Sequence, residues 1–237
     1  MKNLVILGAG TAGTMMSNHL SRVLPDNWNI TIVDQRKIHH YQPGYLFIPF
    51  GTYKEEDIIK PIEKFIPERA RYIQKSIINV DKDQDRVNLE DGQSIPYDLL
   101  IIATGTDIAP GEIDGMVGPH WHKSVFDFYT LEGAVKLHEK LESWEGGHLV
   151  VHITEMPIKC PVAPLEFAFL ADSYFRERGM RDKVKISFVT PMDGAFTKPV
   201  AAASLGHLLD EKNIEVVPNF NIMSLDGENK VMMDYEG

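Results

Sequence analysis

The chain has 237 residues, of which 43% are hydrophobic, enough to build one large or two modest domains. Its formal net charge of −10 argues against nucleic acid as a partner, and the absence of a run of about 18 apolar residues argues against a membrane-spanning helix. A single cysteine, Cys160, excludes an internal disulfide and a cysteine-rich zinc site, and the histidines lack the spacing of a metal site, so we expect no bound metal.

The first forty residues contain the parts of a dinucleotide-binding unit in order. A short apolar run at residues 4–7 is typical of a buried parallel strand, and it leads directly into the glycine-rich residues 8–13. Apolar residues then recur at helical spacing until Pro25, and a second apolar run at residues 30–33 ends on Asp34. Strand, glycine turn, helix, strand and acid together predict a nucleotide site.

Each of these residue types has a physical role in such a site. Gly8 would permit the tight turn, Gly10 would let the backbone approach a pyrophosphate, and Gly13 would let the helix pack closely on the strand. The helix N-terminus would offer unpaired N–H groups to the phosphates, and Asp34 would accept hydrogen bonds from a ribose. The pattern leaves open which dinucleotide binds.

The rest of the first half continues an α/β pattern. Residues 35–45 are loop-like, residues 53–66 predict an amphipathic helix interrupted at Pro61, and residues 71–80, 86–89 and 94–97 predict strands, the last two joined by a hairpin turn. A buried parallel strand then ends at Ala103, Thr104 and Gly105, small residues that would allow a ligand to approach closely.

The second half repeats this architecture after a Gly- and Pro-rich crossover at residues 106–118. We expect helices at residues 130–144, 162–178 and 200–212, and strands at residues 148–154, 184–190, 214–218 and 220–225. The predicted fold class is therefore α/β, with two consecutive Rossmann-like, three-layer units built on parallel sheets. We assign residues 1–113 to the first domain and residues 114–237 to the second, which is incomplete at its C-terminus.

The second unit lacks a glycine loop and carries the cysteine in its place. Residues 155–166 contain no glycine, so we do not expect a nicotinamide nucleotide to bind there. Cys160 stands beside Lys159 and just before a predicted helix N-terminus, and both features favour the nucleophilic thiolate. We favour this reading over a packing role for the thiol. For Glu166, a role as a nearby acid or base and a role as a solvated helix residue both stay open.

Taken together, four sequence features resemble the sulfide:quinone oxidoreductases, two-dinucleotide-domain flavoproteins related to glutathione reductase and type II NADH dehydrogenase. They are the glycine loop with Asp34, the turn at residues 41–44, the Ala-Thr-Gly run at 103–105 and the Lys-Cys-Pro run at 159–161. The glycine loop is specific only to the superfamily, whereas the cysteine that replaces the second loop points to the sulfide branch.

The resemblance implies FAD as cofactor. The implied cofactor-binding residues are Gly8, Ala9, Gly10, Thr11, Ala12, Gly13, Asp34, Gln35, Gln42, Pro43, Ile77, Thr104 and Gly105. Cys160 would be one of two redox cysteines that convert sulfide to persulfide or polysulfide, and Glu166 would move protons. Flavin would then reduce a quinone drawn from the membrane.

Three departures from the family pattern set further expectations. The family's partner cysteine is absent, a third cysteine that some members carry upstream of Cys160 is absent, and residues 231–237 parallel residues 87–92 as though the chain stopped at a hairpin turn. We therefore expect the N-terminal part of a longer protein, with its opening covered by a missing half, a second chain or a second copy. We expect such a part to hold FAD poorly and to turn over little sulfide.

Three alternatives remain. A flavocytochrome-type sulfide dehydrogenase flavin subunit is soluble and exported, and the N-terminus, already a predicted strand, does not look like a signal peptide. A type II NADH dehydrogenase is disfavoured by the missing second glycine loop. A non-catalytic FAD-binding remnant would bind flavin without responding to sulfide. We expect a cytoplasmic or peripheral membrane location, membrane contact following only from the resemblance.

Overall fold

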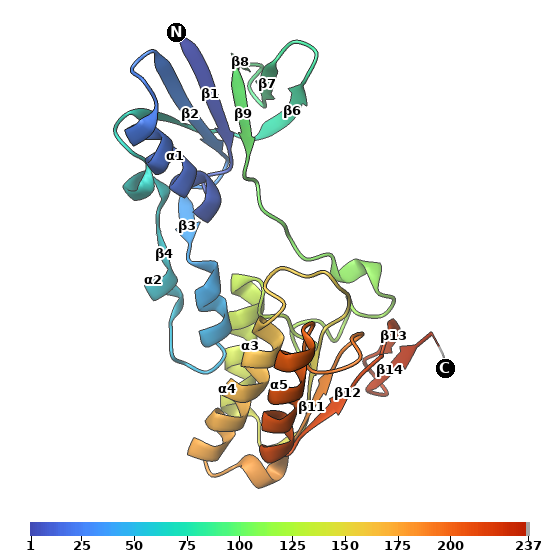
Figure 1. The fold of residues 1–237 in the computed structure, drawn as a ribbon. Helices are drawn as coiled ribbons and strands as arrows, with labels where there is room; N and C mark the ends of the chain where they lie inside the picture. The colour runs from blue at the N-terminus through green and yellow to red at the C-terminus, as the bar shows by residue number, and fades with distance from the viewer. Residues whose placement is uncertain (236–237) are drawn as a thin grey trace. The chain divides into compact units, whose positions relative to one another are not determined.

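The computed structural model describes residues 1–235 and separates them into two compact units (Figure 1). The first unit comprises Met1–Gln42 and Glu56–Asp107, and the second comprises Pro43–Glu55 and the chain from Ile108 onward. The predicted crossover at residues 106–118 begins where the chain leaves the first unit. The assignment of residues 1–113 and 114–237 as two functional domains stays a prediction.

The first unit is built on a four-stranded parallel sheet with the order β5-β2-β1-β9. The strands are β1 (Lys2–Leu7), β2 (Trp28–Asp34), β5 (Ala70–Gln74) and β9 (Leu99–Ile102), and helix α1 (Thr11–Val23) connects the first two. An antiparallel sheet of β6 (Ile77–Asp81), β7 (Arg86–Leu89) and β8 (Ser94–Pro96) completes the unit. The α/β class with parallel sheets is confirmed.

The side chains of β1 point alternately to the two faces of the sheet, and this alternation explains the three layers of the first unit. Leu4 and Ile6 are buried in one cluster, against which Leu20 of α1 packs. Val5 and Leu7 are buried in another, which also contains Val87 of β7. Because successive side chains of a strand point to opposite faces, one face of the sheet is covered by α1 and the other by the antiparallel sheet.

The predicted helix over residues 53–66 is wrong. The structure has a four-residue helix α2 (Glu55–Ile58), a strand β4 (Ile59–Pro61) paired antiparallel with β3 (Ile38–His40), and a 3-10 turn η2 (Ile62–Phe65). A proline lacks the N–H that a helix interior needs, whereas an edge strand tolerates it. The buried Ile58 and Ile62, which gave the helical spacing, lie on either side of this strand.

The single strand predicted over residues 71–80 is likewise two strands. The chain leaves the parallel sheet after β5 and starts the antiparallel sheet at β6, with Lys75 and Ser76 between them. The backbone N–H of Lys75 donates to the carbonyl oxygen of Asp34 at 3.1 Å, which ends the pairing of β5 with β2. The polar residues 74–76 interrupt the apolar pattern at this change of sheet.

The second unit has a three-stranded parallel sheet with the order β10-β11-β12, and the strand predicted at residues 220–225 lies outside it, in a separate hairpin. Its strands are β10 (Gly147–His152), β11 (Val184–Val189) and β12 (Ile214–Val217), and its helices are α3 (Leu131–Ser143), α4 (Ala163–Glu177) and α5 (Pro199–Glu211). Short 3-10 turns lie at η1 (Gln42–Phe47), η3 (Pro110–Glu112) and η4 (Arg181–Lys183). The three predicted helices are confirmed to within two residues at each end.

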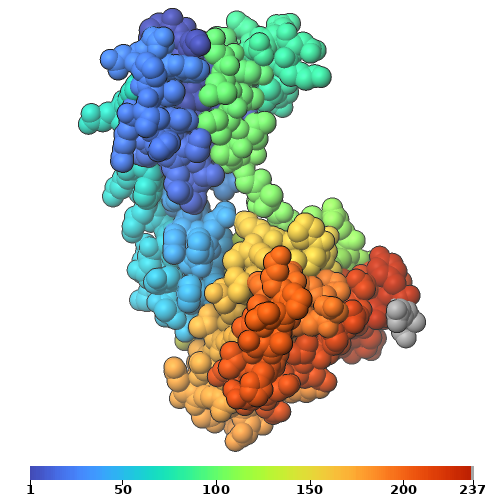
Figure 2. Space-filling view, viewed as in Figure 1, coloured from blue at the N-terminus to red at the C-terminus, as the bar shows by residue number. Residues whose placement is uncertain are grey.

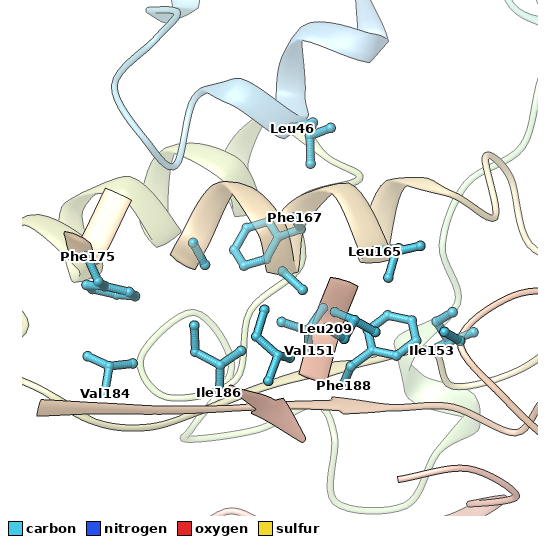
Figure 3. Packing of buried hydrophobic residues seen from close by; sticks show 14 of the residues in the cluster. Leu46, Val151, Ile153, Leu165, Phe167, Phe175, Val184, Ile186, Phe188 and Leu209 are labelled. Atoms are coloured by element: carbon cyan, nitrogen blue, oxygen red, sulfur yellow. The ribbon is translucent and has the colours of Figure 1, made fainter. Parts of the chain in front are cut away.

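The core of this unit lies between α4 and the sheet (Figure 3). Phe167 and Phe175 of α4 belong to the same buried cluster as Val151 of β10 and Ile186 of β11. Leu46, from the 3-10 turn η1, also enters this cluster, which explains why residues 43–55 belong to the second unit.

A buried carboxylate ties several parts of the second unit together. The Asp172 side chain of α4 is fully buried and accepts hydrogen bonds from Arg176 Nε at 2.9 Å, Arg181 Nε at 2.7 Å and Lys212 Nζ at 3.1 Å. Burial opposes the charge, but these bonds outweigh it and hold the pKa of Asp172 below its usual range. This cluster joins α4 to η4 and to the end of α5.

The unit closes with an antiparallel hairpin, β13 (Ile222–Asp226) and β14 (Val231–Asp234). The predicted hairpin turn after residue 234 lies at Glu236 and Gly237, outside the described residues. Helix α5 lies at the surface of the unit, where Val200 is 82% exposed (Figure 2). Across residues 1–235, no helix is both long and apolar enough to cross a membrane.

Candidate functional site

The glycine loop between β1 and α1 packs at distances that only glycine permits. A Cβ at Gly13 would lie 1.8 Å from the carbonyl oxygen of Gly8, so α1 can approach β1 this closely only without a side chain there. Gly8 has a φ of +94°, and a Cβ on it would lie 2.3 Å from the carbonyl oxygen of Ala103. These two glycines therefore serve the fold of the loop itself.

Gly10 differs from Gly8 and Gly13 because nothing in the described chain crowds it. No atom lies within 4 Å of where its Cβ would be, and its φ of −72° suits any residue. It is the N-cap of α1, makes no side-chain capping bond, and is followed by a first turn without acidic residues. The protein's own packing gives no reason for a glycine here, whereas an anion lying against the helix N-terminus would need the space.

Asp34, at the end of β2, is bonded to the loop. Its Oδ2 accepts from the backbone N–H of Ala9 at 2.7 Å, and its Oδ1 accepts from the N–H of Arg36 at 2.8 Å. A carboxylate has about four acceptor sites, so two bonds leave capacity for the hydroxyls of a ribose. The carboxylate thus fixes the loop and stays available to a ligand.

These elements surround a groove of about 250 Å³ within the first unit. The predicted residues that line it are Ala9, Gly10, Thr11, Ala12, Asp34, Gln42, Thr104 and Gly105. Gly8 and Gly13 do not line the groove, and their role is the close packing of the loop against its neighbours. The other predicted residues are not among the lining residues: Gln35, whose side chain accepts a bond from Ser76 Oγ at 3.1 Å, Pro43, which belongs to the second unit, and Ile77, which packs beside a hydrophobic cluster.

His39 also lines this groove, although the sequence did not predict it as a site residue. His39 Nδ1 lies 3.3 Å from the carbonyl oxygen of Ala9, and its ring centroid lies 4.5 Å from that of Phe65. The β3–β4 ribbon brings it there, and that ribbon was predicted as loop and helix. Arg36, Ile38, His40, Ile62, Ala103 and Thr106 also line the groove. Their nearness in sequence to Asp34 and to Thr104 is the signal that could have found most of them.

The cysteine loop lies in the second unit, between β10 and α4. Cys160 is exposed and has a φ of +55°, a left-handed backbone conformation that residues other than glycine adopt infrequently. Its carbonyl oxygen accepts from the N–H of Ala163, the first residue of α4, at 3.0 Å. Glu166 lies in the first turn of the same helix with its side chain exposed. Two residues separate Cys160 from the start of α4, and its functional role stays a prediction.

The chain matches the family model for pyridine nucleotide-disulphide oxidoreductases over residues 2–152. It belongs to this family. The family's proteins are FAD-dependent flavoproteins, so FAD is the cofactor of the family to which this chain belongs. The matched region contains the first unit except Met1 and continues through α3 and β10 of the second.

Sulfide:quinone oxidoreductases are among the curated relatives of this chain. The mitochondrial enzyme of Dictyostelium discoideum is 25% identical over 96% of this chain and 50% of its own length. The sulfide-quinone reductase of Aquifex aeolicus is 27% identical over 100% of this chain and 55% of its own length. A solved structure of the Aquifex aeolicus enzyme matches the whole chain with a TM-score of 0.85 at 24% identity, which shows the fold. The chain spans about half the length of these relatives.

The groove of the first unit fits the cofactor of the family. A dinucleotide needs an anion site for its pyrophosphate and an acceptor for its ribose. The open Cβ position of Gly10 at the N-terminus of α1 and the carboxylate of Asp34 meet these two needs at one groove. No part of the described chain gathers three or more His, Cys, Asp or Glu side chains able to hold a metal ion.

Proposed function

We propose that this chain carries the FAD site and one redox cysteine of a sulfide:quinone oxidoreductase. The proposal is carried by one observation: an exposed cysteine stands in the loop that leads into α4, three residues before its first residue, at the place where the second unit would otherwise hold a glycine loop. The family membership and the curated relatives support the flavin-dependent chemistry.

The residues of the first unit would bind FAD by complementary groups. The backbone N–H groups at the N-terminus of α1 would hold the pyrophosphate over Gly10 and Thr11, and Asp34 would accept the ribose hydroxyls. Thr104 and Gly105 follow β9 and would pack along the cofactor, and Gln42 also lines the groove. Gln35, Pro43 and Ile77 stay proposed contacts from the family resemblance alone.

Cys160 would act as the sulfur acceptor. Its thiolate and a hydrosulfide ion would form a persulfide S–S bond, releasing one proton and two electrons. FAD, when bound, would supply the acceptor for these two electrons, and a quinone would finally take them up together with two protons. Glu166, exposed one turn along α4, would receive the released proton. A second redox cysteine, which the family resemblance implies, is not among these 237 residues.

The absence of a glycine loop from the second unit also bears on the identity of the electron donor. With no glycine in residues 155–162, the loop before α4 offers no backbone approach to a pyrophosphate of the kind seen at Gly10. The proposal therefore names sulfide, rather than a nicotinamide nucleotide, as the electron donor. It also places the enzyme at a membrane surface, as the use of a membrane quinone requires.

The test is a visible absorption spectrum of the FAD-loaded chain before and after anaerobic sulfide, for the wild type and Cys160→Ser. We expect sulfide to bleach the flavin bands of the wild type at least tenfold faster than those of the variant. Both proteins should retain FAD, because Cys160 lies outside the groove of the first unit. Glu166→Gln serves as a companion variant, expected to slow bleaching without preventing it.

Two outcomes would contradict the proposal. If sulfide bleaches the flavin bands of Cys160→Ser as fast as those of the wild type, the cysteine is not the sulfur acceptor. If FAD binds but sulfide leaves the wild-type spectrum unchanged, the chain is a flavin-binding protein without this chemistry of its own.

A further inference from the structure

The loop that presents Cys160 is held by a tyrosine 31 residues away in sequence. The hydroxyl of Tyr129 donates to the carbonyl oxygen of Cys160 at 3.2 Å. The same oxygen accepts from the N–H of Ala163 at 3.0 Å, so both of its lone pairs are used. Two donors from different directions fix the orientation of the peptide group that follows the cysteine.

The backbone of Tyr129 is itself firmly held. Asp127 Oδ1 accepts from the N–H of Tyr129 at 3.0 Å and from the N–H of Thr130 at 2.7 Å. The Asp127 carboxylate lies where a Cβ of Gly133 would be, since its oxygens are 2.1 and 2.6 Å from that position. The N-terminus of α3 therefore provides a rigid base for the tyrosine.

The ring of Tyr129 is supported as well. It lies 5.1 Å, between centroids, from Phe128, which in turn stacks on Phe167 of α4 at 4.6 Å. Phe167 is buried in the core of the second unit. The hydroxyl is thus at the end of a packed aromatic series rather than on a free surface side chain.

Cys160 needs such support. Its φ of +55° costs free energy for a residue with a Cβ, so the conformation persists only where neighbouring groups determine it. We infer that Tyr129 is a positioning residue, which holds the Cys160 backbone in its left-handed conformation and so presents the thiol at the N-terminus of α4. This inference rests on the proposed role of Cys160.

The chemistry of the phenol suits this role. Burial, and then negative charge at Cys160, raise the pKa of Tyr129 above its usual value. The phenol therefore keeps its proton at neutral pH. It remains a neutral donor to the carbonyl and does not act as an acid or base.

The single cysteine allows a direct test. A thiol reagent such as iodoacetamide modifies Cys160 alone, and a 1-¹³C cysteine label marks one carbonyl group. We compare the wild type with Tyr129→Phe, which removes only the hydroxyl. The matched control is Tyr174→Phe, since Tyr174 is a tyrosine of α4 itself whose hydroxyl accepts from Arg178 at 2.6 Å and, within the described residues, makes no bond to the cysteine loop.

We expect Tyr129→Phe to shift the Cys160 carbonyl resonance and to slow alkylation at pH 7 by about three- to tenfold, the effect of one ordinary hydrogen bond. Tyr174→Phe should match the wild type in both measurements.

The inference is overturned if Tyr129→Phe alkylates within twofold of the wild type at pH 7, whether or not the carbonyl resonance moves. Alkylation requires neither sulfide nor FAD, so this result is independent of the proposed function. A wild type that fails to bleach with sulfide, combined with the expected alkylation change, would contradict the function and leave the positioning role intact.

Discussion

His152, at the end of β10, carries a ring nitrogen that is buried and makes no hydrogen bond to the part of the chain that the structure describes. The ring packs against Phe220, with 5.6 Å between centroids. Burial lowers the pKa of His152 to about 4, whereas an exposed histidine in an unfolded chain titrates near 6.5. The unfolded chain therefore takes up a proton before the folded one.

This difference predicts a pH dependence of stability at one residue. The contribution of neutral His152 is fully present above about pH 6.5 and is lost as the pH falls toward 4, by up to about 3 kcal/mol. We expect urea unfolding across this pH range to show the additional decrease in the free energy of unfolding for the wild type but not for His152→Phe. His207→Gln, at an exposed histidine of α5, is the control. If the free energy of unfolding depends on pH equally in His152→Phe and the wild type, His152 is not the source of the pH dependence.

Helix α3 shows how one element is set by a few polar contacts before it. Thr130 is its N-cap, with Oγ1 accepting from the N–H of Gly133 at 3.0 Å and donating to Asp127 Oδ1 at 2.9 Å. We predict that Thr130→Ala lowers the free energy of unfolding by about 1 kcal/mol, because an orphan N–H of the first turn loses its acceptor. Thr130→Ser keeps the hydroxyl and should retain most of the stability in urea unfolding. Equal losses for both variants would indicate that the methyl group, not the cap, matters.

The sequence predicted elements well where one local signal decided them. Pro25 and Gly146–Gly147 mark ends of helical spacing, and the corresponding helices α1 and α3 are present. It failed over residues 53–66, where Ile58 and Ile62 have helical spacing but the intervening β4 pairs with β3, some twenty residues earlier. Strand pairing over such a distance leaves no mark in the local pattern.

At the scale of the whole molecule, the candidate site was predictable only as far as its local motif. The glycine loop and Asp34 are recognisable because their roles depend on adjacent backbone, and the residues from Ala9 to Ala12 line one groove with Asp34. His39 enters that groove through an unpredicted ribbon, and Tyr129 reaches Cys160 from the segment before α3, where Phe128 stacks on Phe167 of α4. Neither contact follows from spacing, because each depends on how separate elements meet.

The central claim, that the groove beside α1 holds FAD, is tested most directly by the FAD dissociation constant of Gly10→Ala. A methyl group at Gly10 meets no protein atom within 4 Å, so the urea unfolding midpoint should be unchanged, whereas at Gly13 the same change would strike the Gly8 carbonyl and destabilise the fold. Gly111→Ala, equally free of neighbours but outside the groove, is the matched control. We predict that Gly10→Ala weakens FAD binding at least tenfold, about 1.4 kcal/mol, and that Gly111→Ala does not. Wild-type affinity in a folded Gly10→Ala variant would contradict the account.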